Sequence, residues 1–536
     1  MKKINNNKIN VKIQRNFCKT IMFVTSIITL LIGFFSITTT VFFNVIINFA
    51  GENCFFKTDN IFLNILSLFI VIVLLYILYK KLLKKINKKY LFLFTVFFSL
   101  ITGFLWVNYL KLEPVSDQYM VYYCANRIIN NDLKTVLGAG NYLSRNPHQL
   151  GFVLYIISIF KIFHITSILF IQNLTVIFSS VCVVTLYFIV KELFKNDIIH
   201  KISLLLISFF AIYLSFFSPH VYGNIPGLAF GLIAILFTLK YIMSNKFWQL
   251  LIVGISIFIS YLLKNNYEIF LIAIIIELFF KSLKDLNRKS IIGIIAIVSI
   301  VFASKAIVYN CFEKTTGFTL NNGVPAISYL YMGIAEPVTL SPGWYTGDVE
   351  NIYNESGYNK QKSIEITKKL LSKRINYLFK NINDSYGYFK AKIQTTWLNP
   401  TFQTIWCSTP GIVLEQNPAY NNYISQKKLL ISIVCGKAYH LEERLMDIYQ
   451  IIIFLSASYS LILIFKYGSL KHLLLPIIFL GGFTFHLIWE TKAIYVLQYY
   501  FLILPYSAFG IYRFLLLINK KIKNTETIFY KLKKKG

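Results

Sequence analysis

Long apolar runs separated by short polar segments are the main pattern along this chain. A helix that crosses a membrane needs about 20 mostly apolar residues. Twelve runs meet or approach that length: 20–48, 60–79, 90–110, 167–190, 202–218, 221–241, 248–263, 268–280, 290–310, 448–465, 472–489 and 493–518. A further run, 149–163, is only about fifteen residues long. The pattern predicts an all-α polytopic membrane protein with about 12–13 transmembrane helices.

Composition supports this fold class. Of the 536 residues, 56% are hydrophobic and only 14% are charged, against roughly 25% charged residues in soluble proteins. This excludes a soluble enzyme, a disordered regulator and a disulfide scaffold. The seven cysteines include no CxxC pair and no zinc-site spacing. Three of them, Cys311, Cys407 and Cys435, fall in one polar segment, where the spacing leaves a disulfide open.

The formal net charge of +31 has a simple explanation in this setting. In a soluble protein it would suggest nucleic acid, but here the lysines cluster between apolar runs, as the positive-inside rule requires of cytoplasmic loops. The N-terminus and the loop 80–89 are therefore expected inside, and the segments 111–148 and 311–446 outside. The alternation works with twelve spans. We therefore expect 149–163 to be re-entrant or interfacial, or to pair with a second short crossing near 166–176.

The same assignment divides the chain into three units. Residues 1–310 form an N-terminal transmembrane module that includes the outer loop 111–148. Residues 311–446 form an α-rich extracytoplasmic domain, with an amphipathic helix expected at 361–382. Residues 447–536 supply the last transmembrane helices and a basic cytoplasmic tail. The first apolar run is too long for a signal peptide, and we expect it to be retained as an anchor.

Charged residues near the spans concentrate on one side. They are Lys264, Glu268, Lys305, Glu490 and Lys492, all at the outer ends of their expected helices. A coupled transporter would instead carry charges at the middle of its spans. Any single lysine could simply extend toward the interface, but together with the two long polar loops these charges indicate chemistry at the outer surface.

The loop after the third span carries the main candidate for catalysis. Pro114 ends the span, Ser116 can cap a new helix, and residues 117–130 form an amphipathic interfacial helix. Asp117 would lie in the first turn of that helix, where a fixed carboxylate can act as a general base toward an acceptor hydroxyl. The alternative is an acid that only complements the helix dipole.

The same loop carries the candidates for phosphate binding. Arg145 and His148, in the stretch 142–149, could contact a phosphate at headgroup level, as could Arg127. The alternative for this stretch is a proline turn with a solvated arginine. Lys264 and Lys305 would face these residues from the ends of separate spans.

Together these segments resemble the bacterial polytopic GT-C glycosyltransferases, the family 39 and protein-mannosyltransferase-like group. The resemblance covers most of residues 90–500. It rests on Ser116-Asp117-Gln118, Tyr142-Leu-Ser-Arg-Asn-Pro-His-Gln149, the Asn173-containing span, Tyr222-Gly-Asn-Ile-Pro226, Lys264-Asn-Asn-Tyr267, Met332-Gly333, Trp344-Tyr-Thr-Gly-Asp348 and Trp397-Leu-Asn-Pro400.

The resemblance implies an outer active site, an acid in the first large loop and a polyprenyl-phosphate-linked sugar as donor. Asp117 matches the family's acid. Two features depart from the family: Gln118 stands where many members carry a second acid, and three spans precede the acid where one is usual. A single acid gives a hard cation few oxygen ligands, so no cofactor is assigned and a divalent cation is left open. Sugar stacking or packing remain alternatives for Trp344, Trp397 and Trp406.

The sequence thus predicts a multi-pass enzyme of a bacterial cell membrane with an extracytoplasmic active site. It would transfer a sugar from a polyprenyl-phosphate donor to a cell-wall glycan, lipid or protein acceptor, in contact with membrane lipid and without nucleic acid. The alternative function is a non-catalytic transporter, or a polymerase, of lipid-linked glycans.

Overall fold

The computed structural model describes residues 2–47, 52–111, 113–114, 116–285, 288–320, 323–408, 429, 432–433 and 436–533, with side chains from residue 9 to residue 521 apart from Asp285. Within these ranges the chain is almost entirely helical, and ten helices are long and apolar enough to cross a membrane. The predicted fold class, an all-α polytopic membrane protein, is confirmed.

The elements of the first half follow the expected runs. They are α1 (Lys2–Phe42), β1 (Phe43–Ile47), β2 (Cys54–Thr58), α2 (Ile61–Ile77, continued by a π-helical turn Leu78–Leu83), α3 (Lys88–Leu110), α4 (Ser116–Ile129), α5 (Lys134–Leu137), α6 (Tyr142–Arg145), a 3₁₀ turn (Pro147–Gln149), α7 (Leu150–Phe163), α8 (Ile168–Leu193), α9 (Asp197–Phe217), α10 (Asn224–Ser244), α11 (Trp248–Leu263), a 3₁₀ turn (Asn265–Tyr267), α12 (Glu268–Asp285) and α13 (Arg288–Thr316).

The second half contains the long polar segment and the last spans. Its elements are α14 (Ala326–Ile334), α15 (Asp348–Glu355), α16 (Lys360–Lys380), α17 (Ile382–Trp397), α18 (Thr404–Ser408), α22 (Lys437–Phe465), a 3₁₀ turn (Leu470–His472), α23 (Leu474–Ile488), a 3₁₀ turn (Ala493–Tyr495) and α24 (Leu497–Lys533). The amphipathic helix expected at 361–382 is confirmed as α16.

The first apolar run ends earlier than its hydropathy suggests, which corrects the prediction of a span to residue 48. Helix α1 stops at Phe42, and the chain turns into an antiparallel hairpin in which Phe43 pairs with Thr58 and Ile47 with Cys54. Val45, Ile46 and Ile47 are β-branched and favour strands. An unbroken apolar run does not by itself separate helix from strand, so the sequence pattern missed this hairpin.

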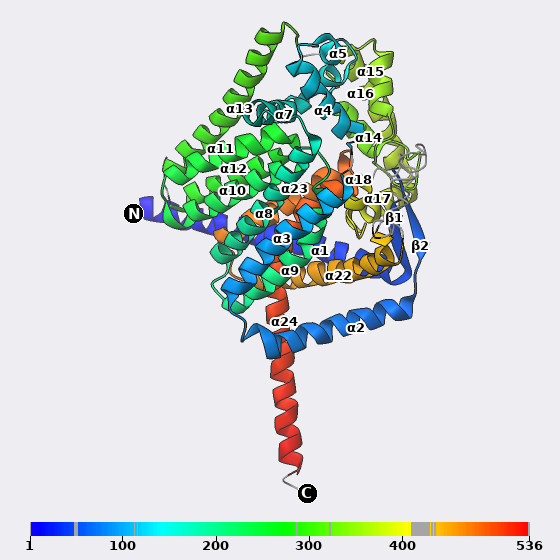
Figure 1. Cartoon of the computed structure of the whole chain (residues 1–536). Helices are drawn as coiled ribbons and strands as arrows, with labels where there is room; N and C mark the ends of the chain where they lie inside the picture. Colours follow the sequence, from blue (N-terminus) through cyan, green and yellow to red (C-terminus); the bar gives the residue numbers. More distant parts are fainter. Residues whose placement is uncertain are drawn as a thin grey trace.

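Helix α7 lies with the outer loops. Its buried residues, among them Val153 and Ile156, share one apolar cluster with α4, with Leu263 at the end of α11, and with Val221 and Leu320, which follow α9 and α13. Figure 1 shows α7 beside α4 and next to the end of α11. The arrangement agrees with an interfacial α7 and keeps the order of the later spans.

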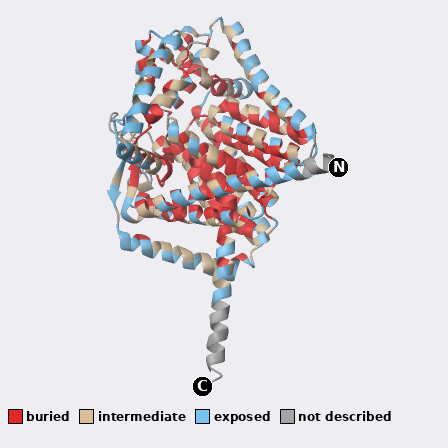
Figure 2. Ribbon diagram, turned by 180° about the vertical axis from the view of Figure 1, so that it is seen from behind, coloured by how far each residue is buried: buried red, intermediate tan, exposed pale blue. Residues whose placement is uncertain are grey.

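The core is made by helices that are distant in sequence. In Figure 2 the buried residues concentrate in the middle of the helix bundle, whereas α2 is exposed along its length. Helices α1 and α22 pack side by side, and the hydroxyls of Thr29 and Ser458 form a 2.5 Å hydrogen bond between them. Because α2 is among the most apolar helices, its exposed side chains suit contact with lipid.

The polar segment predicted as 311–446 holds α14 to α18, which gather at one end of the bundle (Figure 1). Helix α13 continues to Thr316 and α22 begins at Lys437, so both expected boundaries fall inside helices. The division of the chain into three units stays a prediction. Of the three cysteines noted above, Cys311 is exposed and Cys407 is buried, both as free thiols, and Cys435 lies outside the described residues.

Candidate active site

Helix α4 presents Asp117 at the outer end of the bundle. The chain leaves α3 through Lys111, which adopts a left-handed conformation with φ of 47°, and α4 begins at Ser116. The helix expected at 117–130 is confirmed by these bounds. Asp117 lies in the first turn and is exposed, so the structure leaves its carboxylate accessible.

Gln118, the residue that replaces a second acid, fixes the start of this helix. Its side chain is buried, donates to the carbonyl of Cys407 at 3.3 Å and accepts from the backbone N–H of Val221 at 3.1 Å. These two bonds join α4 to the chain after α9 and to α18. The neighbour of Asp117 therefore acts as an anchor, and it leaves Asp117 as the only acid of this turn.

Lys264 lies close to Asp117. It follows α11, and its ammonium lies 3.9 Å from the centre of the Tyr222 ring and 5.5 Å from that of Tyr495, in cation–π geometry. Burial lowers the pKa of Lys264 to about 8, against the opposing effect of the Asp117 and Glu490 carboxylates. A cation that is partly desolvated in this way interacts strongly with an incoming anion.

His148 lies within reach of the charges of both Lys264 and Lys305. Burial, reinforced by the charges of Lys264 and Lys305, lowers the pKa of His148 to about 3, so this imidazole is neutral. Lys305 donates to the Tyr261 hydroxyl at 3.0 Å. Gln149 hydrogen-bonds both His148, at 3.2 Å, and the Tyr222 hydroxyl. Lys264, Lys305 and the neutral imidazole of His148 thus belong to one part of the site.

Arg145 connects this loop to the outer helices. Its guanidinium lies 3.9 Å from the carboxylate of Glu350 in α15, and its backbone carbonyl accepts from Val324 at 2.9 Å. The adjacent Asn146 accepts from the Tyr329 hydroxyl at 3.2 Å. The stretch 142–149 is therefore the joint between the first outer loop and the segment after α13.

Arg127 lies apart from these residues. It is exposed, pairs with Asp132 of its own loop at 3.1 Å and stacks on Tyr123 at 4.9 Å. None of its contacts within the described parts of the chain joins it to Asp117 or Lys264. Charge effects link Asp117 with Lys264, and His148 with Lys264 and Lys305. Arg145 lies in the same stretch as His148 but pairs with Glu350 of α15, and Arg127 is left out.

Three further charged residues lie near Asp117 and Lys264, namely Glu490, Lys492 and Glu52. We call these five residues the outer charged cluster. Lys492 lies after α23 and pairs with Glu52 of the N-terminal hairpin at 2.7 Å. Burial acts to lower the pKa of Lys492, but Glu52 and Glu490 more than offset it, and the pKa is raised. Burial raises the pKa of Glu490, which the charges of Lys492 and Lys264 oppose.

The segment 489–492 is held in place by the outer helices. Glu490 donates its backbone N–H to the Tyr329 carbonyl at 3.2 Å, and Thr491 donates to that of Gly343 at 2.8 Å. The buried Lys392 bridges the carbonyls of Gly333 and Trp489. Glu490 and Lys492 had been noted in the sequence only as charges at helix ends, and no local motif marked Glu52.

Some expectations from the sequence need correction or sharpening. Glu277, a charged residue that the sequence analysis did not single out, stands in the middle of α12 and is fully buried. Trp344 and Trp397 are fully buried, and packing is their role in place of sugar stacking. Within the described ranges, no group of three or more His, Cys, Asp or Glu side chains is placed to hold a metal ion.

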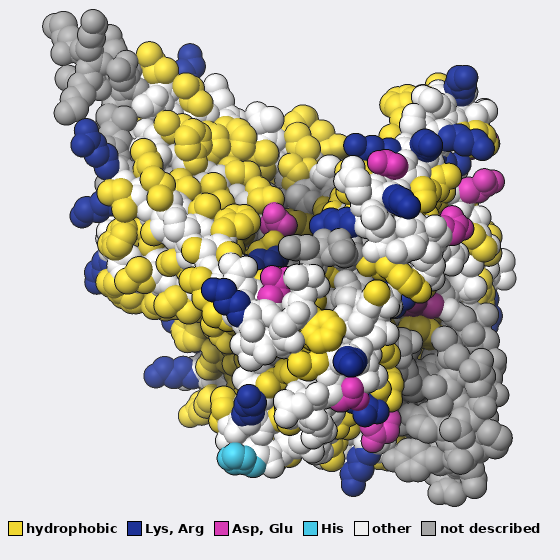
Figure 3. Space-filling model, turned by 90° about the horizontal axis from the view of Figure 1, so that it is seen from above, with side chains coloured by type: hydrophobic (Ala, Val, Ile, Leu, Met, Phe, Trp, Pro, Cys, Tyr) yellow, Lys and Arg dark blue, Asp and Glu magenta, His cyan; other side chains and the backbone are white. Residues whose placement is uncertain are grey.

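The outer face brings these features together. Seen from above (Figure 3), basic and acidic side chains lie near the middle of the face, between an apolar flank and a more polar part of the surface. An anionic headgroup could therefore approach charged residues while its hydrocarbon tail remains beside apolar surface.

Comparison with known proteins gives one matching family model, over part of the chain. Residues 150–309 match the family model described as dolichyl-phosphate-mannose-protein mannosyltransferase. This confirms the resemblance to the GT-C glycosyltransferases over that stretch. No curated protein sequence matches the chain.

A solved structure with a similar chain path is the archaeal oligosaccharyltransferase AglB from Archaeoglobus fulgidus, in complex with an inhibitory peptide and a dolichol-phosphate. The TM-score is 0.41 and the sequence identity 13%. The alignment covers 82% of this chain but 52% of AglB. The chain therefore corresponds to about half the length of that protein.

Proposed function

We propose that this chain, whose residues 150–309 match a mannosyltransferase family, transfers a sugar from a polyprenyl-phosphate donor to an acceptor of the bacterial cell envelope. The reaction would take place at the outer face of the cell membrane. The observation that carries the proposal is the outer charged cluster, in which an exposed carboxylate lies beside partly buried lysines at the ends of the spans. That combination provides a base for a hydroxyl and cations for a phosphate.

Asp117 would act as the general base. Its carboxylate takes the proton of an acceptor hydroxyl, the acceptor oxygen forms a bond to the anomeric carbon, and the bond between that carbon and the phosphate oxygen breaks. The polyprenyl phosphate then leaves with the bonding electron pair and an added negative charge. A base in this position contributes typically 10²–10⁴-fold to the rate.

Lys264 would hold the donor phosphate. Its ammonium is fixed against two aromatic rings, Tyr222 and Tyr495, and burial keeps part of its water away. Lys305 and His148 border the same place. The phosphate is bound in the donor and gains charge as the sugar leaves, so a cation here favours both binding and the transition state.

A product analysis tests this proposal against the alternatives. We would compare cell-envelope glycans and lipid-linked sugars of a deletion strain with those of the parent by mass spectrometry. A glycosyltransferase predicts loss of one sugar unit from an envelope product, with accumulation of the lipid-phosphate sugar. Changed chain length would indicate a polymerase, and an unchanged product with lipid-linked glycan retained inside would indicate a transporter.

A further inference from the structure

We infer that Glu52, carried by the N-terminal hairpin, is a positioning residue of the active site that holds Lys492 beside Asp117. The inference rests on the proposed function, because it assigns a role at the same site. It also assigns a role to the hairpin between α1 and α2, in the part of the chain where this protein has more spans before the acid than GT-C members usually have. Helices α1 and α2 lie outside the stretch that matches the family model.

The contact at the tip of the hairpin is specific. Both carboxylate oxygens of Glu52 accept from the ammonium of Lys492, at 2.8 and 2.7 Å. Gln403 donates a third hydrogen bond to Glu52, at 2.7 Å. The side chains of the pair are 23% and 17% exposed, so water screens their attraction less than it would at a free surface.

The position of Gln403 is itself determined by a neighbouring turn. Asn399 accepts from the backbone N–H of Gln403 at 2.9 Å and donates to the carbonyl of Val45, in strand β1, at 3.0 Å. The N–H of Cys54, in strand β2, donates to the Ser341 hydroxyl at 2.6 Å. The hairpin is therefore tied to the outer helices on both strands near Glu52.

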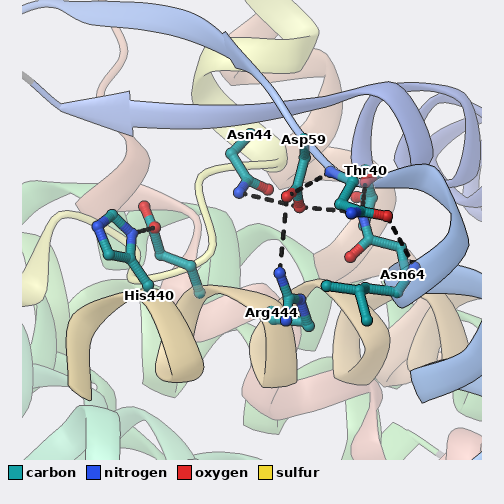
Figure 4. Close-up of polar contacts among 9 residues, drawn as sticks. Thr40, Asn44, Asp59, Asn64, His440 and Arg444 are labelled. Carbon is teal, nitrogen blue, oxygen red and sulfur yellow. Dashed lines mark hydrogen bonds and ion pairs between the residues drawn. The ribbon is translucent and has the colours of Figure 1, made fainter. Parts of the chain in front are cut away.

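The base of the hairpin has a separate anchor. Figure 4 shows Asp59 pointing toward Arg444 of α22, with Asn44 and Asn64 on either side. The guanidinium lies 3.7 Å from Asp59, and the two amides donate to its carboxylate at 3.2 and 2.9 Å. This second anchor can be altered without touching the tip, which provides a matched control.

The charges around Lys492 explain why its position matters. Glu52, Glu490 and Asp117 all stabilise its charged form. Without the carboxylate of Glu52, the ammonium would be drawn toward Glu490 and Asp117, the other carboxylates that stabilise its charge. A carboxylate that an ammonium stabilises in its charged form accepts the acceptor's proton less readily. Glu52 thus keeps Lys492 in place and Asp117 available.

A double-mutant cycle tests this role. Glu52→Gln, Lys492→Met and the double variant would be purified in detergent. Initial rates would be measured with a lipid extract of the deletion strain as donor and its envelope fraction as acceptor. We expect Glu52→Gln to lower kcat at least about tenfold with little change in donor KM. If Glu52 acts through Lys492, it should have no further effect once Lys492→Met is present.

The controls separate positioning from simple anchoring. Asp59→Asn loosens the base of the same hairpin, so it should lower stability while rates per folded molecule stay near wild type. Gln403→Leu removes one contact of Glu52 but keeps the ion pair, and it should lower kcat less than Glu52→Gln does. Should Glu52→Gln fail to fold, Gln403→Leu carries the test, and an unchanged kcat for it would overturn the inference.

Two further outcomes are decisive and distinct. Equal rate losses for Glu52→Gln and Asp59→Asn, or additive effects of Glu52→Gln and Lys492→Met, would overturn the positioning role. In either case an inactive Asp117→Asn would leave the proposed function standing. A fully active Asp117→Asn would instead remove the proposed function, and the inference with it.

Discussion

At the scale of single residues, Asp117 and Gln118 divide two tasks between neighbours. Gln118 is buried and fixes the first turn of α4, whereas Asp117 is exposed beside Lys264 and Lys492. A carboxylate that is held by its neighbour can remain accessible without losing its position. This is the arrangement that a base needs if it is to meet an acceptor from outside.

The first prediction concerns the proposed role of Asp117 as the base. Asp117→Asn keeps the shape of the side chain and loses its proton affinity, so turnover should fall by roughly 10²–10⁴-fold. Abundance in the membrane should be unchanged. Asp132→Asn, at a half-exposed acid of the same loop that pairs with Arg127, is the matched control and should remain active. Near-normal glycosylation by Asp117→Asn would exclude it as the base.

The second prediction concerns the pH dependence of donor binding. Because the pKa of Lys264 is lowered to about 8, the residue is cationic below that pH and becomes neutral as the pH rises through it. The apparent donor KM of the wild type should therefore rise between about pH 7.5 and 9. Lys264→Gln should weaken donor use by about 1–3 kcal/mol at neutral pH and should lose this pH dependence.

A comparison with Lys305 makes that test specific. Lys305→Gln removes a cation that already donates to Tyr261, so its effect on the donor KM should be smaller. Unchanged donor kinetics for both variants would remove the two lysines from the site. A pH dependence that persists in Lys264→Gln would assign the titration to another group.

Some residues of the candidate site could be predicted from the sequence and others could not. Asp117 and Lys264 follow recognisable helix ends, and local signals of that kind are visible in one chain. Arg127 has the same local features but finds its own partner, Asp132, within the loop. Glu52 gave no signal, because its role depends on Lys492, a partner 440 positions away.

At the scale of elements, the contact between α14 and the segment 489–492 is unusually close. A Cβ added to Gly333 would lie 2.2 Å from the carbonyl carbon of Trp489 and 2.5 Å from the amide nitrogen of Glu490. These are backbone atoms, which cannot rotate away as a flexible side chain would. The position of Glu490 therefore depends on the absence of a side chain at residue 333.

The third prediction uses this contact. Gly333→Ala should destabilise the protein by about 1–3 kcal/mol, as overpacking does, and should lower kcat because Glu490 and Lys492 are displaced. Thermal unfolding in detergent and initial rates would measure both effects. Gly387→Ala is the control. It lies in α17 with nothing within 4 Å of the added atom, and it should be neutral or stabilising.

Helices could be predicted from the sequence where the spacing of apolar residues followed a single period. Helix α16 has a clear amphipathic pattern and was found nearly to its ends. The hairpin β1–β2 was missed because Val41, Phe42 and Phe43 continue the apolar run across the end of α1 into β1. Its strands are stabilised by partners such as Asn399, and such tertiary contacts leave no periodicity in the sequence.

At the scale of the whole molecule, the charge pattern orients the bundle. The lysine-rich turn after α2 and the outer loops lie at opposite ends of α3. The outer charged cluster and the helices α14 to α18 lie at the same end of the bundle as the outer loops. The fourth prediction tests this orientation directly.

A membrane-impermeant thiol reagent applied to intact cells should label Cys at position 134 or 360 and leave Cys at position 85 unlabelled. All three native residues are exposed lysines. The background would carry Cys311→Ser and Cys435→Ser, because an exposed Cys311 would itself react if it lies outside. Labelling at position 85 alone would invert the molecule and move the site to the cytoplasm.

The pairing of α1 with α22 has a consequence for the timing of synthesis. Thr29 meets Ser458 across 429 positions, and ribosomes add about 5–20 residues per second. The first helix therefore waits about 20 to 90 seconds in the bilayer before its partner exists. During that interval Thr29 keeps the bond within its own helix, to the Ser26 carbonyl at 3.0 Å, but lacks its partner on α22. Lys492 is made later still, so the nascent chain holds Glu52 and Asp117 long before it holds this lysine. The order of translation thus leaves the proposed site incomplete until the last helices are inserted.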